Sequence, residues 1–239
     1  MMASKRLLLL SNSTNFGEGY LDHALGSIRD FLGRGVKEVL FIPYAGVTIA
    51  WDTYASKVAE RYKEIGYDMT PIHKTTAADA VANAQAIAVG GGNTFHLLKT
   101  MYDNNIVDAI RERVLNGCPY MGWSAGSNVA GPTICTTNDM PIVEPPSFTA
   151  LDLVPFQLNP HYTDARLPNH GGETRADRLA EFVESNPGKY VVGLKEGSIL
   201  RVEGTELSLL GDHDARIFRK GDEIRDVKPS ESLQFLTTG

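Results

Sequence analysis

Short apolar runs alternate with helical patterns through the first half of the chain. The apolar runs predict buried strands at residues 7–10, 39–42, 87–89 and 120–123. Between them, apolar residues recur at helical spacing over residues 21–32, 51–65, 95–101 and 106–114. Strands that alternate with helices and short turns predict an α/β fold, in which a mostly parallel sheet carries helices on both faces.

The second half of the chain has a different pattern. Residues 132–160 are rich in proline and weakly periodic, which indicates irregular loops or short strands over the sheet. A helix is predicted over residues 174–185, and a further core strand over 190–194. Short antiparallel strands with glycine turns are then predicted at residues 198–202, 207–210, 216–218 and 232–236. Because no repeat or linker interrupts the chain, we expect a single domain over residues 1–239.

Composition narrows the class of protein. The chain has 239 residues, of which 42% are hydrophobic and 22% charged, as in ordinary soluble globular proteins. Its net charge is −6 and it contains no block of Lys and Arg, so a nucleic-acid partner is not expected. A small anionic ligand remains compatible with this charge, since it needs only one well-placed cation.

The cysteines and the first residues favour a cytoplasmic protein. Cys118 and Cys135 are too few for a disulfide scaffold, and neither stands in a zinc-binding spacing. The apolar run at residues 7–10 is too short for a signal peptide or a membrane span, so no membrane association is expected.

The sequence Gly122-Trp123-Ser124-Ala125-Gly126 follows a predicted strand and precedes a predicted short helix. A nucleophile elbow requires small residues on both sides of its serine, because the strand-to-helix turn leaves no room for side chains there. Ser124 is therefore the candidate nucleophile, and the amide of Ala125 is a candidate oxyanion donor. The simpler interpretation is a glycine-rich turn that only packs a strand against a helix.

A second glycine-rich turn, Gly90-Gly91-Gly92-Asn93-Thr94, also ends a predicted strand and opens a helix. In a doubly wound sheet, the carboxyl ends of the strands form the ligand crevice. The amides of Gly91 and Gly92 could supply the second oxyanion donor. A helix N-cap or a phosphate-binding loop explains the same residues, and the sequence leaves these alternatives open.

A serine nucleophile requires a base and an acid that orients it. Among six histidines, His161 is the best candidate, because Asn159-Pro160-His161 closes a short apolar run at an expected strand end. Two acids are suitable, Glu196 and Asp139. Glu196 follows a predicted core strand, which favours it, whereas Asp139 could instead anchor the substrate amine or form a structural turn.

Two further features concern ligands. His161, Asp164, His170 and Glu173 contain the donor types of a metal site, but their spacing matches no known helical pair, so no metal is expected. Arg175 lies just inside a predicted helix. Its side chain is either solvated in the first turn of the helix or forms a bidentate pair between its guanidinium group and a substrate carboxylate.

Several motifs together resemble peptidase E, the α-aspartyl dipeptidase family. The likeness extends from the first strand to the glycine that follows Glu196, and it fades after that. It is carried by residues 90–95, 122–126, 136–141, 159–161 and 172–175.

This resemblance implies a flavodoxin-like fold similar to class I glutamine amidotransferases, with serine in place of their cysteine nucleophile. It implies that Ser124 is the nucleophile and His161 the base, that Asp139 and Glu196 are the two proposed acids, and that Arg175 reads the aspartyl side chain. It implies no cofactor.

The working hypothesis is a cytoplasmic serine dipeptidase, monomeric or homodimeric, that hydrolyses Asp-X dipeptides through an acyl-enzyme. The alternatives are a cyanophycinase-like hydrolase of β-aspartyl peptides and, from a different class, a non-catalytic anion-binding module.

Overall fold

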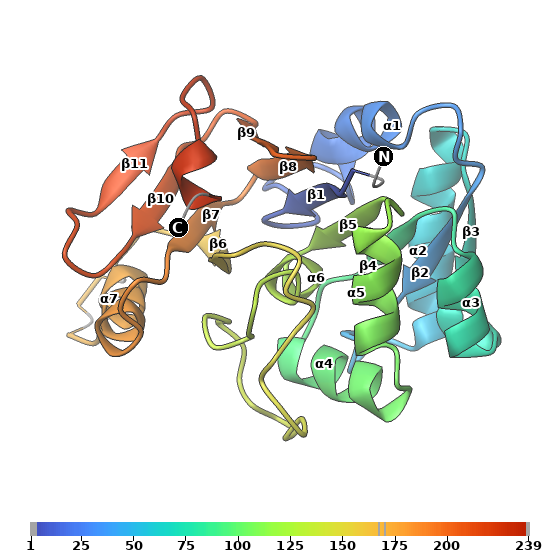
Figure 1. Cartoon of the computed structure of the whole chain (residues 1–239), viewed down its shortest axis with the longest axis horizontal. Coiled ribbons are helices and arrows are strands. Elements are labelled where there is room, and N and C mark those ends of the chain that lie inside the picture. Colours follow the sequence, from blue (N-terminus) through green and yellow to red (C-terminus); the bar gives the residue numbers. More distant parts are fainter. Residues whose placement is uncertain (1–3, 167, 170, 238–239) are drawn as a thin grey trace.

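The computed structural model describes residues 4–166, 168–169 and 171–237, and it is built around a seven-stranded sheet (Figure 1). The strands of this sheet lie in the order β3-β2-β4-β5-β1-β8-β9. The first five in that order pair in parallel, and β8 and β9 are antiparallel additions. The predicted α/β class is therefore confirmed. The bounds are β1 (Arg6–Leu10), β2 (Glu38–Ile42), β3 (Asp68–Pro71), β4 (Ile87–Val89), β5 (Tyr120–Trp123), β8 (Ile199–Glu203) and β9 (Glu206–Leu210).

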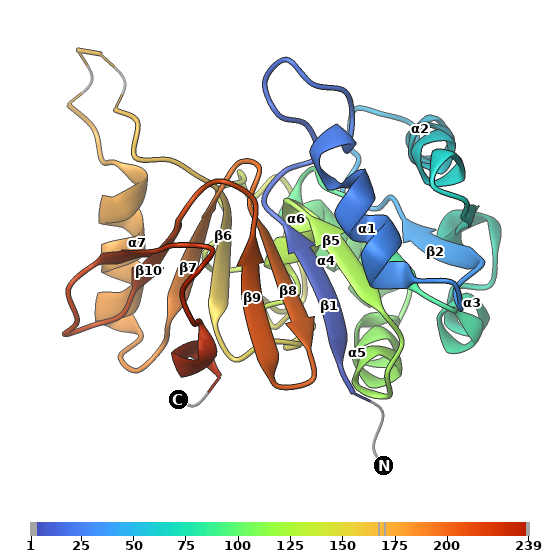
Figure 2. The same ribbon diagram turned by 90° about the horizontal axis from the view of Figure 1, so that it is seen from above.

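Helices cover both faces of this sheet, and β1 shows why its sequence is apolar throughout. Leu7 and Leu9 belong to one core cluster and Leu8 and Leu10 to another, because successive side chains of a strand point to opposite faces. Figure 2 shows α1 and α2 on one face and α3 and α5 on the other. The bounds are α1 (Leu25–Leu32), α2 (Trp51–Glu64), α3 (Ala77–Asn83), α4 (Thr94–Asp103) and α5 (Val107–Leu115).

A second sheet of four strands lies beside the first (Figure 1). One of its faces is covered by α7 (Arg175–Ser185), whose Leu179 and Val183 pack on Val191. Its other face contributes to the same core cluster as the larger sheet. The strands lie in the order β11 (Arg225–Val227), β10 (Ala215–Phe218), β7 (Val191–Lys195) and β6 (Gln157–Tyr162).

The structure corrects the sequence analysis at three points. The strand predicted at 190–194 is β7, which belongs to the second sheet and not to the larger one. The strand predicted at 232–236 is wrong, because Gln234–Leu236 forms a turn of 3-10 helix. Leu233 and Leu236 are both buried, and that spacing of three places them on one side of a helical turn. Finally, α3 and β11 were not expected from the sequence.

The helices are short relative to a bilayer. The longest described helix, α2, has 14 residues, and none of the described helices is both long and apolar enough to cross a membrane.

Candidate active site

Ser124 lies on a sharp turn between β5 and α6 (Ala125–Asn128). Its backbone angles are φ 53° and ψ −114°, a combination that residues other than glycine rarely adopt. The turn is possible because its flanking glycines touch other backbone. A Cβ on Gly122 would lie 2.3 Å from the Gly126 carbonyl oxygen, and one on Gly126 would lie 2.1 Å from that of Val89. The strand–turn–helix arrangement predicted from the sequence is confirmed.

The tight fit predicts that Gly126→Ala destabilises the protein by more than about 2 kcal/mol, because the added methyl must displace backbone. Gly26→Ala is the matched control: Gly26 is exposed within α1, and its added Cβ would meet nothing within 4 Å. That change is expected to stabilise by about 0.5–1 kcal/mol, since alanine favours a helix over glycine. Urea unfolding of both variants checks this. Equal midpoints for Gly126→Ala and the parent would contradict it.

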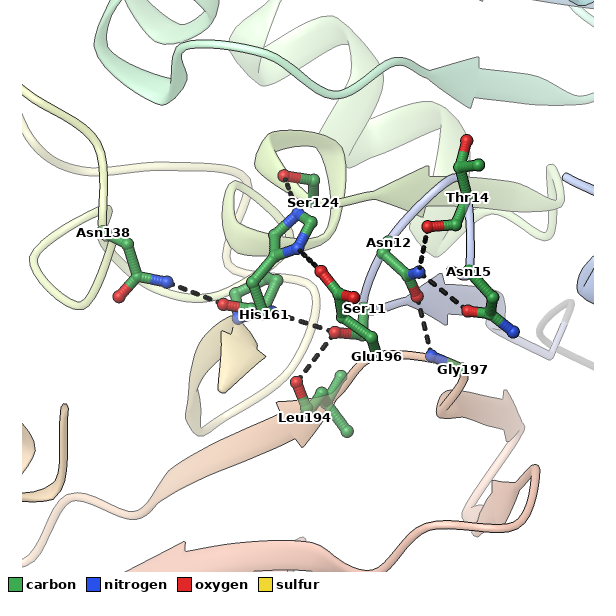
Figure 3. Close-up of polar contacts among 11 residues, drawn as sticks. Ser11, Asn12, Thr14, Asn15, Ser124, Asn138, His161, Leu194, Glu196 and Gly197 are labelled. Atoms are coloured by element: carbon green, nitrogen blue, oxygen red, sulfur yellow. Dashed lines mark hydrogen bonds and ion pairs between the residues drawn. The ribbon is translucent and has the colours of Figure 1, made fainter. Parts of the chain in front are cut away.

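His161 reaches the serine from the second sheet, where it is the penultimate residue of β6 and so lies near the strand end expected for it. The pairing of β6 with β7 shifts register between Asn159 and Tyr162, and His161 has a positive φ of 54°. A bulge of this kind re-aims a side chain. As a result, His161 Nε2 lies 2.9 Å from Ser124 Oγ (Figure 3).

Glu196 lies on the other side of the imidazole (Figure 3). Its Oε1 is 2.7 Å from His161 Nδ1, and it follows β7 in the turn that leads to β8. Asn12 holds that turn, because its Oδ1 accepts a hydrogen bond of 2.8 Å from the amide of Gly197. Since a carboxylate on Nδ1 fixes the ring tautomer, this geometry leaves Nε2 free to accept the serine proton.

Asp139 makes different contacts. Its Oδ2 accepts hydrogen bonds from the Thr94 amide at 2.7 Å and the Thr94 hydroxyl at 2.6 Å, and the Thr137 hydroxyl lies 3.2 Å away. These contacts place the carboxylate at the first residue of α4, beside the glycine turn. The sequence left two acids open, and the structure brings Glu196, not Asp139, into hydrogen-bond contact with the imidazole.

The glycine turn approaches the serine closely. A Cβ on Gly91 would lie 2.9 Å from that of Ser124, and Gly92 has a φ of 138° with the Ala45 carbonyl against it. No described residue accepts a hydrogen bond from the backbone amides of Gly91, Gly92 or Ala125. These amides are therefore free to donate to a ligand beside Ser124.

Ser11 was not identified from the sequence as a site residue. Its hydroxyl donates to the Leu194 carbonyl at 2.7 Å and accepts from the His161 amide at 2.9 Å, so it joins the end of β1 to both β6 and β7 (Figure 3). One signal was available. Ser11 directly follows a buried strand, at the edge of the sheet where the candidate nucleophile was expected.

Arg175 is the first residue of α7 and is half-buried. It lines a cavity of about 660 Å³ together with His161 and Glu196, but it does not line the cleft that contains Ser124. No other described residue forms a hydrogen bond or ion pair with its guanidinium. Burial, with nearby Arg178, lowers the pKa of Arg175 from its usual value. A cation that is desolvated and unpaired favours the approach of an anion.

Three of the residues considered for a metal site, His161, Asp164 and Glu173, belong to no metal-binding group of described residues. Asp164 forms ion pairs with Lys195, at 3.0 Å, and with Arg216. Within the described ranges no three His, Cys, Asp or Glu residues form a group that could hold a metal ion. His170, one of the four residues considered, lies outside those ranges.

The chain is similar in sequence to characterised families. Residues 7–210 match the model of peptidase family S51. A protein named Peptidase E from Nostoc sp. is 52% identical over 234 residues, which cover 98% of this chain and 97% of the relative. Another Peptidase E, from Shewanella amazonensis, is 51% identical over 232 residues, covering 97% and 98%.

Two solved structures share the fold. A peptidase from an acI-B1 actinobacterium has a TM-score of 0.73 at 17% identity and covers 97% of each chain. A candidate peptidase E from Listeria monocytogenes has a TM-score of 0.66 at 21% identity, covering 87% of this chain and 99% of the other.

Proposed function

This chain belongs to peptidase family S51, whose members are serine-type peptidases, and from that premise we propose that it hydrolyses Asp-X dipeptides with Ser124 as nucleophile. The observation that carries the proposal is the continuous contact from Ser124 Oγ through the His161 ring to Glu196 Oε1, with distances of 2.9 Å and 2.7 Å. The name Peptidase E of the relatives, together with the resemblance described above, supports the choice of substrate.

The reaction proceeds in two stages. Ser124 Oγ attacks the carbonyl carbon of the aspartyl residue while His161 Nε2 takes the hydroxyl proton. The protonated imidazole, stabilised by Glu196, then gives that proton to the nitrogen of the leaving residue, and the C–N bond breaks. An aspartyl ester of Ser124 remains. Water then attacks the ester with His161 again as base, which releases aspartate and restores the hydroxyl.

The oxyanion of each tetrahedral intermediate lies beside the two glycine-rich turns. We assign its stabilisation to the free amides of Ala125 and of Gly91 or Gly92, which come from two different loops next to Ser124. Donors held in place before the reaction stabilise the developing charge without reorganisation. The loss of one such donor typically costs about 10²-fold or more in rate.

We assign Arg175 to the β-carboxylate of the aspartyl residue, because it is an unpaired cation in a cavity that shares His161 with the serine cleft. Arg175→Met is expected to lower kcat/KM for Asp-Leu by about 10²-fold and to abolish the preference over Asn-Leu, since a bidentate charged pair is lost. The control is Arg178→Met on the same helix, whose side chain is exposed and ion-paired with Glu173. An unchanged Asp-Leu to Asn-Leu ratio in Arg175→Met would show that this assignment is wrong.

The test of the function itself compares Asp-Leu with β-Asp-Leu on the unmodified protein. The proposal expects release of aspartate from Asp-Leu at a much higher kcat/KM than from β-Asp-Leu. A preference for the β-linked peptide would instead assign the protein to the cyanophycinase-like alternative.

We also propose that the protein acts in the cytoplasm on a small-molecule dipeptide, as a monomer or homodimer and without a cofactor. Its two cysteines form no disulfide, and Cys135 is an exposed thiol, which is compatible with a reducing compartment. Cell fractionation tests the compartment, and light scattering tests the oligomeric state.

A further inference from the structure

A second cation lines the cleft that contains the candidate nucleophile. The cleft that contains Ser124 has a volume of about 740 Å³ and is also lined by His161, Gly91, Gly92 and Lys57. Lys57 is the only Lys or Arg among the described residues that line it. Arg175 lies in the neighbouring cavity, and the two spaces share His161. His161 therefore lines both the space that contains Arg175 and the space that contains Lys57.

Aromatic contacts hold Lys57 in a defined position relative to the nucleophile. Its Nζ lies 4.2 Å from the ring centroid of Tyr20, which in turn lies edge-on to Trp123 at 6.4 Å. Trp123 directly precedes Ser124. On the helix turn before Lys57, the Tyr54 hydroxyl accepts from Trp123 Nε1 at 3.1 Å and donates to the Gly91 carbonyl at 3.1 Å. The aromatic residues Tyr20, Tyr54 and Trp123 thus connect α2 to the serine turn and to the glycine turn.

The charge of Lys57 is left without an opposite charge. No described carboxylate forms an ion pair with its ammonium group, and a contact with an aromatic ring attracts the cation without neutralising it. Among the described residues that line the cleft there is no Asp, Glu or Arg and no second Lys, and the lining includes apolar side chains such as Ile49 and Ile142. A single cation in such a surface recognises an anion next to an apolar group.

We propose that Lys57 binds the C-terminal carboxylate of the leaving residue. The inference rests on the proposed function, because an Asp-X dipeptide carries two carboxylates, one on each side of the scissile carbonyl. In the described part of the chain, one cation without an ion pair lines each of the two adjacent spaces, Arg175 for the aspartyl side and Lys57 for the leaving side. A tripeptide would carry its carboxylate about 3.5 Å farther from the scissile bond. Lys57 would therefore contribute to the selection of dipeptides.

The experiment measures kcat/KM for three substrates, Asp-Leu, Asp-Leu amide and Asn-Leu. The parent is expected to prefer the acid to the amide by about 10-fold, as for one charged hydrogen bond at a partly exposed site. In Lys57→Met this preference should fall to about 1 through a higher KM for Asp-Leu, with kcat unchanged and the ratio of Asp-Leu to Asn-Leu retained. Arg175→Met should keep the preference for the acid over the amide and lose the preference for Asp-Leu over Asn-Leu.

The control is Lys63→Met, which removes the same charge from an exposed position on the same helix and does not line the cleft. It is expected to retain the acid preference, whereas a general effect of net charge would lower the preference in both variants. The inference is overturned if the parent shows no preference for the acid, if Lys57→Met retains that preference, or if Lys57→Met alters the ratio of Asp-Leu to Asn-Leu instead. Failure of the parent to cleave any of these substrates would refute the proposed function as well and is recognised separately.

Discussion

Ser124→Ala is expected to lower kcat for Asp-Leu by about 10⁴-fold or more, the range found when a serine peptidase loses its nucleophile. The physical reason is the loss of the hydroxyl oxygen that lies 2.9 Å from His161 Nε2. The flanking Gly122 and Gly126 hold this oxygen on a tight turn. Initial rates of aspartate release measure the effect. The folded state should be retained, because the methyl group still fits the turn.

The matched control for this change is Ser127→Ala, three residues along the chain. The Ser127 hydroxyl is buried within hydrogen-bond distance of the carbonyls of Leu10 and Gly122 and donates its one proton to either, so it supports the turn without reaching the cleft. Its loss is expected to cost about 1 kcal/mol of stability and less than about 10-fold in rate. If Ser124→Ala kept more than a hundredth of the parent rate, the nucleophile would have to be another group.

Glu196→Gln is expected to lower kcat by about 10³-fold, whereas Asp139→Asn should cost less than about 10-fold. An amide at position 196 cannot stabilise the imidazolium, and it can hold the ring in the wrong tautomer. The expected loss is smaller than for a buried triad acid, because the Glu196 side chain is 53% exposed and water screens its charge. Asp139 contacts Thr94 and not His161, so its substitution alters the start of α4 and the electrostatic interaction with Arg175 and leaves the contacts of the imidazole in place.

Steady-state kinetics of both variants on Asp-Leu decide between the two acids. A larger loss in Asp139→Asn than in Glu196→Gln would reverse the assignment, and would mean that the contact at Glu196 is not the one used in the reaction.

The elements of the larger sheet could be predicted well because their signals are local. Leu7 to Leu10 are apolar at every position, which is typical of a strand buried on both faces, and β1 has helices over both. The elbow at Ser124 was predictable for the same reason, since the small residues and the flanking strand are neighbours in the sequence. The single-domain interpretation of residues 1–239 stays a prediction.

The partners of Ser124 required information that is not local. His161 was placed at a strand end from the apolar run before it, but its direction depends on a register shift between β6 and β7 that no sequence pattern indicates. The choice between Glu196 and Asp139 depended on which loop the second sheet brings to the imidazole. Lys57 was missed because an isolated Lys carries no pattern of its own, and only the fold places it in the cleft. The position of Ser11 directly after a buried strand was a signal, but its contact with the His161 amide depends on the fold.

The division of the site between two sheets has a consequence for biosynthesis. Ser124 follows β5 of the larger sheet, whereas His161 and Glu196 are contributed by β6 and by the turn after β7 of the smaller one. A nascent chain of which only the first half has left the ribosome therefore carries the Ser124 hydroxyl without the His161 imidazole beside it. With the roles proposed for these three residues, hydrolysis of a dipeptide requires that translation has passed Glu196 and that the second sheet has docked.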